Sequence, residues 1–378
     1  MPRKTTLGDI AKLADVAPGT VYKALSGNKG VSEQKRKEII SLARSLNYVL
    51  TNHALPARRL LIALFPSPVG DDRYFYQYIW EGIARRETEL ADTGLHVIKV
   101  TFDGTQENQK DRLEEIFSLY KDTMFGLLTI IWEESEFLET LNKFSSVGIK
   151  IFTVSSDAPS SHRSGCVMAD SYRTGRLAAE YLGSVIKGKA RVIVVGTKRD
   201  SYNHAQVVRG FFDQMNTTNP QIQIIELYES RMYPEEVFKT LQDFLSRFED
   251  IKGIYANNAR TTIRILETAR EQKQHRKLFV VGSELFDESS RALREGTLDA
   301  IIAQNAFQQA YEGVNVAFRS LSGTEQITTK EIVPNALYLR NNLPLEQQAK
   351  SQSIIQMLDK EFLKDSEKAK QDSPRKTT

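Results

Sequence analysis

The sequence predicts a small all-α domain at its N-terminus, followed by a larger α/β domain with two lobes, each built on a doubly wound parallel sheet. Two patterns and the chain length predict this architecture. Residues 5–48 read as three short amphipathic helices with tight connections. From Leu60 onwards, apolar runs of five to seven residues alternate with amphipathic segments of a dozen or more, as in parallel βαβ units. The 378 residues also exceed what one hydrophobic core usually organises.

The N-terminal domain is expected to contain three helices. Thr6 is a good N-cap for the first helix, because its hydroxyl can accept a hydrogen bond from the first turn. We expect the second helix over Thr20 to Leu25, with Pro18 tolerated in its first turn. Residues 26–30 have the composition of a loop, and Ser32 then caps a longer third helix.

The larger domain is expected to alternate strands with helices. The apolar runs predict nine strands, at Leu60–Phe65, His96–Thr101, Gly126–Ile131, Lys150–Ser155, Arg191–Val195, Ile222–Leu227, Gly253–Tyr255, Leu278–Val281 and Asp299–Ala303. Nine strands over about 280 residues indicate two open sheets with chain crossovers between them. A ligand would then bind in the cleft between the lobes.

These patterns divide the chain into four segments. Residues 1–50 form the three-helix domain, 51–59 a hinge or linker, and 60–344 the two-lobed domain. Residues 345–378 are rich in Gln, Lys, Glu and Ser with few apolar residues. We expect one amphipathic helix there, followed by a disordered tail from about Asp365.

The composition is that of a soluble globular protein, with 40% hydrophobic and 26% charged residues. No apolar run approaches the roughly 18 residues that a membrane helix needs, and no apolar segment follows the basic start, so we expect a cytoplasmic protein and no membrane partner. Cys166 is the only cysteine, which excludes an internal disulfide and a multi-cysteine zinc site. We expect its side chain to be a small buried apolar group.

Positive charge is concentrated at the N-terminus. Residues 1–59 carry eleven Lys and Arg against four Asp and Glu, a net charge of +7. Because the whole chain carries +3, the remaining residues carry −4. This asymmetry is typical of a domain that binds nucleic acid, joined to a body that does not.

The second predicted helix has a start suited to the DNA major groove. Its first residues are short or hydrogen-bonding and include a cation, as a groove-reading helix requires: Pro18, Gly19, Thr20, Tyr22 and Lys23. Thr20 and Tyr22 offer hydroxyls, whereas Lys23 could donate to guanine acceptors or contact a phosphate. We also place Thr6, Asn28 and Ser32 at the DNA interface.

Residues 6–48 strongly resemble the helix-turn-helix head of lactose-repressor-type (LacI family) regulators. The resemblance is carried by the segments LGDIAKLA, VAPGTVYKALSG and VSEQKRKEI. This chain has Ala17, Pro18-Gly19 and Lys23 where the family usually has Ser, a polar pair and Arg, so an operator sequence does not carry over. The resemblance implies a hinge helix that inserts a leucine into the minor groove, for which Leu55 is the candidate, with a plain linker as the alternative.

Residues 60–343 resemble the periplasmic sugar-binding type of effector domain. The matches are SDAP at 156–159, ADSYRTG at 169–175, ANN at 256–258, GSE at 282–284 and LREGTLDAIIAQN at 293–305. This resemblance implies two lobes that close on a sugar or polyol. Such ligands are held by planar polar side chains that donate and accept in pairs, with an aromatic ring over an apolar sugar face.

The resemblance implies a set of ligand contacts from both lobes. Phe75 and Tyr76 supply rings, and Ser155 or Asp157 with Arg163 forms one rim. The other rim is expected to contain Asn257, Asn258, Glu284 and Gln304, with Asn203 and Gln206 as polar candidates near Val207, where the family has an arginine. The alternatives are that Asp157 is a turn or cap residue and that Phe75 belongs to the core.

Together these features predict a ligand-responsive, sequence-specific transcriptional regulator. We expect a homodimer that binds palindromic double-stranded operator DNA and a small-molecule effector. No phosphate-binding loop, dinucleotide fingerprint, zinc-protease motif or nucleophile elbow is present, so no cofactor, metal or catalysis is expected. The alternatives are a solute-binding protein of a sugar transport system and, more remotely, an enzyme acting on a sugar.

Overall fold

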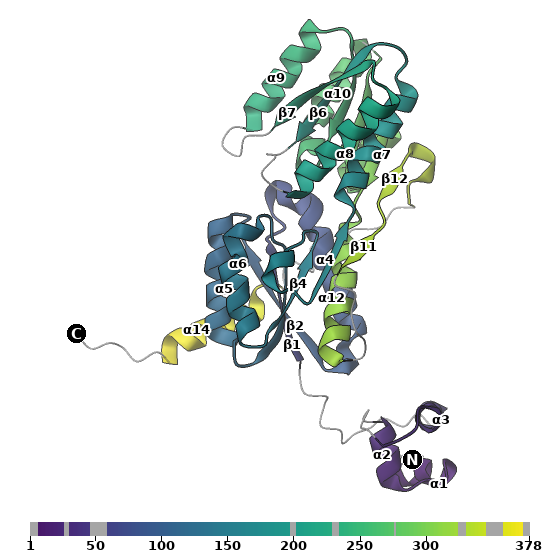
Figure 1. Cartoon of the computed structure of the whole chain (residues 1–378), viewed down its shortest axis with the longest axis vertical. Coiled ribbons are helices and arrows are strands. Elements are labelled where there is room, and N and C mark those ends of the chain that lie inside the picture. The colour runs from purple at the N-terminus through teal and green to yellow at the C-terminus, as the bar shows by residue number, and fades with distance from the viewer. Residues whose placement is uncertain are drawn as a thin grey trace, which may run out of the picture. The chain divides into compact units, whose positions relative to one another are not determined.

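The computed structural model describes residues 7–25, 30–45, 59–196, 202–228, 234–275, 277–323, 330–344 and 358–372. The chain forms two compact units, residues 1–58 and 59–378 (Figure 1). This division falls inside the segment 51–59 expected to be the linker. We call the first unit the head and the second the body, and describe each by itself.

The described residues of the head form the predicted bundle of three short helices. They are α1 (Leu7–Leu13), α2 (Pro18–Leu25) and α3 (Glu33–Ser45). Their buried apolar side chains form one small core, made of Ile10, Ala11, Ala14, Val21, Ala24, Ile39 and Ala43. The hydroxyl of Ser32 accepts a hydrogen bond from the backbone N–H of Lys35 at 3.3 Å, as a cap of α3 should. The second helix begins at Pro18, so this proline lies in its first turn as expected.

Each lobe of the body is built on a six-stranded sheet. Lobe 1 has the strand order β11-β5-β4-β3-β1-β2 and lobe 2 the order β12-β10-β9-β8-β6-β7. All pairs are parallel except that of β10 with β12, which is antiparallel. The strands of lobe 1 are β1 (Arg59–Pro66), β2 (Leu95–Phe102), β3 (Met124–Thr129), β4 (Lys150–Val154), β5 (Gly165–Ala169) and β11 (Glu331–Val333). Those of lobe 2 are β6 (Ala190–Gly196), β7 (Ile222–Tyr228), β8 (Ile251–Ala256), β9 (Phe279–Ser283), β10 (Ala300–Ala303) and β12 (Ala336–Tyr338).

Helices pack against the sheets, as the alternating pattern predicts (Figure 1). Lobe 1 carries α4 (Arg73–Glu89), α5 (Gln106–Tyr120), α6 (Glu134–Ser146), α12 (Ala306–Ser322) and α14 (Lys360–Asp372). Lobe 2 carries α7 (Ser171–Val185), α8 (Tyr202–Thr218), α9 (Pro234–Arg247), α10 (Ala259–His275) and α11 (Asp287–Glu295). Short 3₁₀ turns lie at Gly70–Asp72, Ala91–Thr93, Pro159–Ser161 and Arg340–Asn342.

The described chain crosses between the lobes three times, after β5, after β10 and between β11 and β12. The crossovers are hydrogen-bonded to one another. Asn305 Nδ2 donates to the carbonyl oxygen of Pro334 at 2.6 Å, and Asn335 Nδ2 donates to that of Asp170 at 2.8 Å. The three segments therefore form one connected hinge between the two sheets.

The strand prediction was incomplete. It did not include β5, β11 or β12. Strand β5 is a five-residue run of small and sulfur-containing residues, and the other two are three residues long, so none makes a long apolar run. The edge strands β11 and β12 therefore come from segments that cross between the lobes, and these segments have no hydrophobic periodicity from which a strand could be predicted.

The predicted start of C-terminal disorder near Asp365 is also corrected. Helix α14 continues to Asp372 because lobe 1 holds it. The Phe362 side chain is fully buried in the core of lobe 1, and the Asp365 carboxylate accepts a hydrogen bond from Tyr120 Oη at 2.8 Å. Burial of one aromatic side chain thus fixes a helix whose sequence is otherwise strongly polar.

Candidate functional site

The start of α2 presents the residues predicted to read DNA. Pro18, Gly19 and Lys23 are exposed, and Thr20 is partly exposed. The Arg36 guanidinium donates to the carbonyl oxygens of Lys23 and Ala24 at 3.3 and 2.8 Å, which joins the last turn of α2 to α3. Thr6, Asn28, Leu55 and the Tyr22 side chain lie outside the described residues. Ser32 is exposed and caps α3.

In the body, the predicted polar contacts of lobe 2 follow neighbouring strands at their carboxyl ends. Asn257 and Asn258 follow β8, Glu284 follows β9 and Gln304 follows β10, and these strands are adjacent in the sheet. Parallel strands end at one edge of a sheet, so these side chains lie along one rim. Asn258 also caps α10, because its Oδ1 accepts from the backbone N–H of Thr261 at 2.8 Å.

Glu284 occupies a constrained position at this rim. Its φ is +68°, in the left-handed region, and only 5% of its surface is exposed. Burial raises the pKa of its carboxyl to about 7, although the Gln304 N–H donates to it and opposes that rise. The protein therefore holds a carboxyl group that changes charge near neutral pH at the end of a buried strand.

The predicted contacts of lobe 1 follow β4. Ser155 has a φ of +63°, and its carbonyl oxygen accepts a hydrogen bond from Asn203 Nδ2 of lobe 2 at 2.5 Å. Asp157 is ion-paired with Arg163, and Lys330 lies 3.3 Å from its other oxygen. Burial alone would raise the pKa of Asp157, but the two cations hold it below its usual range. The Asp157–Arg163 rim is thus a satisfied ion pair.

Three buried polar atoms of the predicted set have no hydrogen-bond partner among the described residues. They are Ser155 Oγ, Asn203 Oδ1 and Asn257 Nδ2. Asn257 has no exposed surface, and its amide lies over Gly196 at the end of β6, where an added Cβ would come within 2.3 Å of Nδ2. Because buried polar groups are nearly always paired, such atoms indicate where a polar ligand or bound water completes the site.

The aromatic side chains of α4 are arranged differently from the predicted contacts. Tyr76 is buried in the core of lobe 1, and Phe75 packs against that core. The rings that meet lobe 2 are those of Tyr74 and Tyr78. Tyr74 lies 4.6 Å, centroid to centroid, from Phe286 at the start of α11. The four-residue spacing of the two tyrosines, one helical turn, is the signal that places them on one face.

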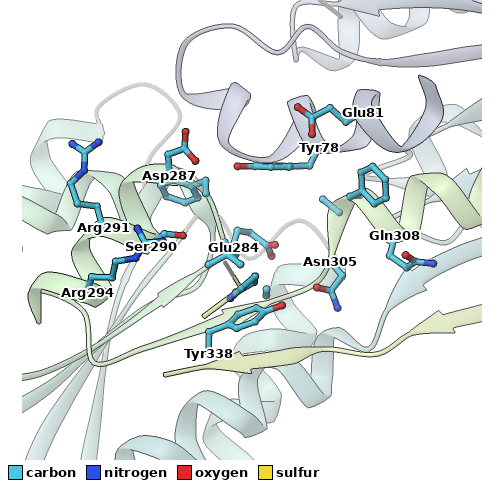
Figure 2. Close-up of a pocket in the computed structure, with 16 residues that line it drawn as sticks. Tyr78, Glu81, Glu284, Asp287, Ser290, Arg291, Arg294, Asn305, Gln308 and Tyr338 are labelled. Atoms are coloured by element: carbon cyan, nitrogen blue, oxygen red, sulfur yellow. The ribbon is translucent and has the colours of Figure 1, made fainter. Parts of the chain in front are cut away.

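A cavity of about 690 Å³ lies between the lobes beside Glu284. Its volume falls within the range usual for small-molecule sites. In Figure 2, Tyr78 and Glu81 of α4 lie on one side, Tyr338 of β12 lies on the other, and the Glu284 carboxylate lies between them. Of the predicted ligand contacts only Glu284 lines this cavity; Gln304 does not, although its neighbours Ala303 and Asn305 do. The lining is Tyr78, Glu81, Glu284, Leu285, Phe286, Asp287, Ser290, Arg291, Arg294, Ala303, Asn305, Ala306, Phe307, Gln308, Tyr338 and Pro344.

Sequence reasoning missed most of this lining. Burial, and then the charge of Asp287, raise the pKa of the Glu81 carboxyl. Burial also raises the pKa of Tyr78. These groups come from α4 and α11, whose sequences read as ordinary amphipathic helices, so nothing local marks them as cavity residues.

Within the described part of the chain, no group of three or more His, Cys, Asp or Glu residues is arranged to hold a metal ion. None of the described helices is both long and apolar enough to cross a membrane. The side chains that line the cavity offer amides, hydroxyls, carboxylates and aromatic rings, which can hydrogen-bond and stack against a polar ligand.

Fold and site together define a class of protein, in which a helix-turn-helix head precedes a two-lobed ligand-binding body. The chain belongs to the family of periplasmic binding protein domains, which matches residues 62–325. Residues 6–50 match the bacterial regulatory proteins of the lacI family. The expected fold and family resemblance are confirmed, and the chain is a DNA-binding regulator with a lacI-type head and a body of the periplasmic binding protein type.

Known proteins match nearly the whole chain, or about three quarters of it, at low identity. The HTH-type transcriptional regulator DegA of Bacillus subtilis is 23% identical over 346 residues, which are 90% of this chain and 98% of DegA. The solved structure of GanP, a glucose-galactose binding protein from Geobacillus stearothermophilus, is 22% identical with a TM-score of 0.66, over 76% of this chain and 99% of GanP. A putative LacI transcriptional regulator from Bacteroides fragilis is 16% identical with a TM-score of 0.66, over 75% and 98% of the two chains.

Proposed function

We propose that the head reads double-stranded operator DNA through the start of α2, and that the body senses a sugar, polyol or related small molecule between its lobes. The observation that carries the effector proposal is the set of buried, unpartnered atoms Ser155 Oγ, Asn203 Oδ1 and Asn257 Nδ2. They come from both lobes, so one ligand that satisfied them would favour one arrangement of the lobes. Glu284 and Gln304 supply further polar groups at the same rim.

We further propose that the chain works in the cytoplasm as a homodimer. A two-fold symmetric pair of heads reads two half-sites, which makes the operator palindromic. An effector that prefers one lobe arrangement then changes DNA affinity if that arrangement alters the spacing of the paired heads. The role is regulatory and involves no catalysis.

Two measurements on the full chain test this function. A gel shift with genomic fragments should give a sequence-specific complex whose affinity falls steeply with salt. A thermal-shift screen of monosaccharides, polyols and their phosphates should identify the effector, since binding to the native state raises its stability. Adding that effector should then change the affinity for DNA measured in the gel shift.

Matched variants locate the effector. Ser155→Ala and Asn203→Ala should abolish the thermal shift while leaving DNA binding intact. Ser146→Ala, an exposed serine on α6, is the control and should change neither. If the effector still raised the melting temperature of both Ser155→Ala and Asn203→Ala, the effector would bind somewhere other than this rim.

The second candidate function is a solute-binding protein, because the body alone has that fold. It predicts the same sugar binding without any sequence-specific DNA complex. The gel shift therefore separates the two functions.

A further inference from the structure

The turn between β1 and α4 contacts lobe 2 through a run of consecutive residues. Arg264 donates through Nε and Nη2 to Asp71 Oδ2, at 3.0 and 2.6 Å. Arg260 Nη2 donates to Asp72 Oδ1 at 2.6 Å. Arg73 Nη2 lies 3.4 Å from the carboxylate of Glu288. We call the four residues Asp71, Asp72, Arg260 and Arg264 the latch.

The two sides of the latch match in register. Arg260 and Arg264 are four residues apart on α10 and therefore lie on one face of that helix, opposite consecutive aspartates of lobe 1. The four side chains are 26 to 38% exposed, so water and salt reach them. The ion pairs are thus placed where ionic strength can weaken them.

An apolar contact lies directly beside the latch. Tyr74 is 5% exposed, and it packs with Phe286 and Ala259 of lobe 2 in a cluster separate from the cores of the lobes. Separating the lobes at this point would expose these side chains and break both ion pairs at once.

We propose that the latch stabilises the arrangement seen here, in which the lobes touch through these residues and which we call closed, and that it so sets effector affinity through residues outside the predicted effector contacts. This inference rests on the proposed function, because it assigns the lobes an open and a closed arrangement. Apparent affinity scales with the fraction of protein in the arrangement that binds. The four residues are therefore positioning residues for effector binding.

The lobe arrangement is measured directly in the effector-free full chain. Spin labels on Glu107→Cys in α5 and Lys239→Cys in α9, both exposed, report the distance between the lobes by pulsed electron resonance. Cys166 is 1% exposed and burial raises the pKa of its thiol to about 11, so it labels slowly. Because no effector is needed, this result is independent of whether the effector is found.

Neutralising either side of the latch should open the lobes. Asp71→Asn with Asp72→Asn, and Arg260→Gln with Arg264→Gln, should each lower the closed-to-open ratio by up to about fivefold per ion pair. High salt should move the unaltered chain the same way and should have less effect on the variants. The charge swap Asp71→Arg with Arg264→Asp should recover part of the closed population.

The matched control removes an ion pair inside one lobe. Lys110 Nζ and the Glu136 carboxylate are 2.7 Å apart, both within lobe 1, and are 39 and 48% exposed, somewhat more than the latch. Lys110→Gln with Glu136→Gln should therefore leave the distance between the lobes unchanged. The same distance distribution in the unaltered chain and in both neutralised variants would overturn the proposal. An equal shift in the control would overturn it as well, since loss of surface charge alone would then explain the effect.

Discussion

The backbone N–H of Gln304 donates to both carboxylate oxygens of Glu284, at 3.2 Å each. The two residues follow the adjacent strands β10 and β9. A carboxylate can accept about four hydrogen bonds. Because this backbone N–H is its donor and the side chain has almost no exposed surface, the charged form of Glu284 is costly to bury. The free energy of unfolding should therefore depend on pH through this carboxyl group.

Glu284→Gln should stabilise the protein at high pH. The pKa of this carboxyl rises from 4.5 to about 7 on folding, so its contribution to stability is complete below pH 4.5 and is lost as pH rises towards 7. A neutral amide of the same shape has no charge to bury. The free energy of unfolding at pH 8 should therefore rise by up to about 3 kcal/mol.

Denaturant titrations of both proteins at pH 5 and pH 8 measure this difference. The gap between Glu284→Gln and the unaltered chain should be small at pH 5 and large at pH 8. The exposed Glu107→Gln is the control and should show no such gap. A gap of equal size at both pH values would mean that the carboxyl titrates in the ordinary range.

The same rim shows how far the sequence could predict the site. Glu284, Asn257 and Gln304 follow apolar strands in motifs that resemble a known family, so their placement at one edge was predictable. The rings of α4 were not, because Tyr74, Phe75, Tyr76 and Tyr78 are all aromatic within one short segment. Which of these rings contacts lobe 2 depends on how α4 is rotated about its axis relative to lobe 2, whose residues lie more than a hundred positions further along the chain.

The C-terminal helix provides a second prediction. Phe362 is fully buried, and Asp359 accepts hydrogen bonds from the backbone N–H of Thr101 at 2.7 Å and from its hydroxyl at 2.5 Å, on the edge strand β2. Phe362→Ala should therefore destabilise lobe 1 by about 3 kcal/mol and release α14. Hydrogen exchange at the Thr101 amide should then accelerate, because its acceptor leaves.

Leu363→Ala is the matched control for the C-terminal helix. Leu363 is the next residue of the same helix but is 49% exposed, so its loss should cost little. If Phe362→Ala left both the unfolding free energy and the Thr101 exchange rate unchanged, α14 would not be a fixed part of lobe 1.

The crossing of α7 and α8 gives a third prediction. A Cβ at Gly210 would lie 1.9 Å from the carbonyl oxygen of Tyr172, and one at Gly175 would lie 1.8 Å from that of Val207. These are backbone atoms, so the helices would have to separate. Gly210→Ala should cost about 2 kcal/mol or more of unfolding free energy, whereas Gly19→Ala, with open space around it, should not destabilise. Equal unfolding midpoints for the two variants would contradict this.

The position of Lys23 on α2 favours one of its two possible DNA contacts. A groove-reading helix places its first residues against base edges, and α2 begins at Pro18, whereas Lys23 lies in its last turn. We therefore expect Lys23 to contact a phosphate and Thr20 a base edge. Lys23→Ala should weaken binding equally across operator variants and reduce the slope of log affinity against log salt by about 1.

Thr20→Ala should instead lower affinity for the preferred operator by about 1 to 3 kcal/mol and relax its preference at one base pair. Fluorescence anisotropy over a set of single-base operator variants at several salt concentrations measures both effects. Since both side chains belong to the head, effector binding should be unchanged in either variant. Loss of base preference in Lys23→Ala with an unaltered salt slope would reverse the assignment and place the lysine in the groove.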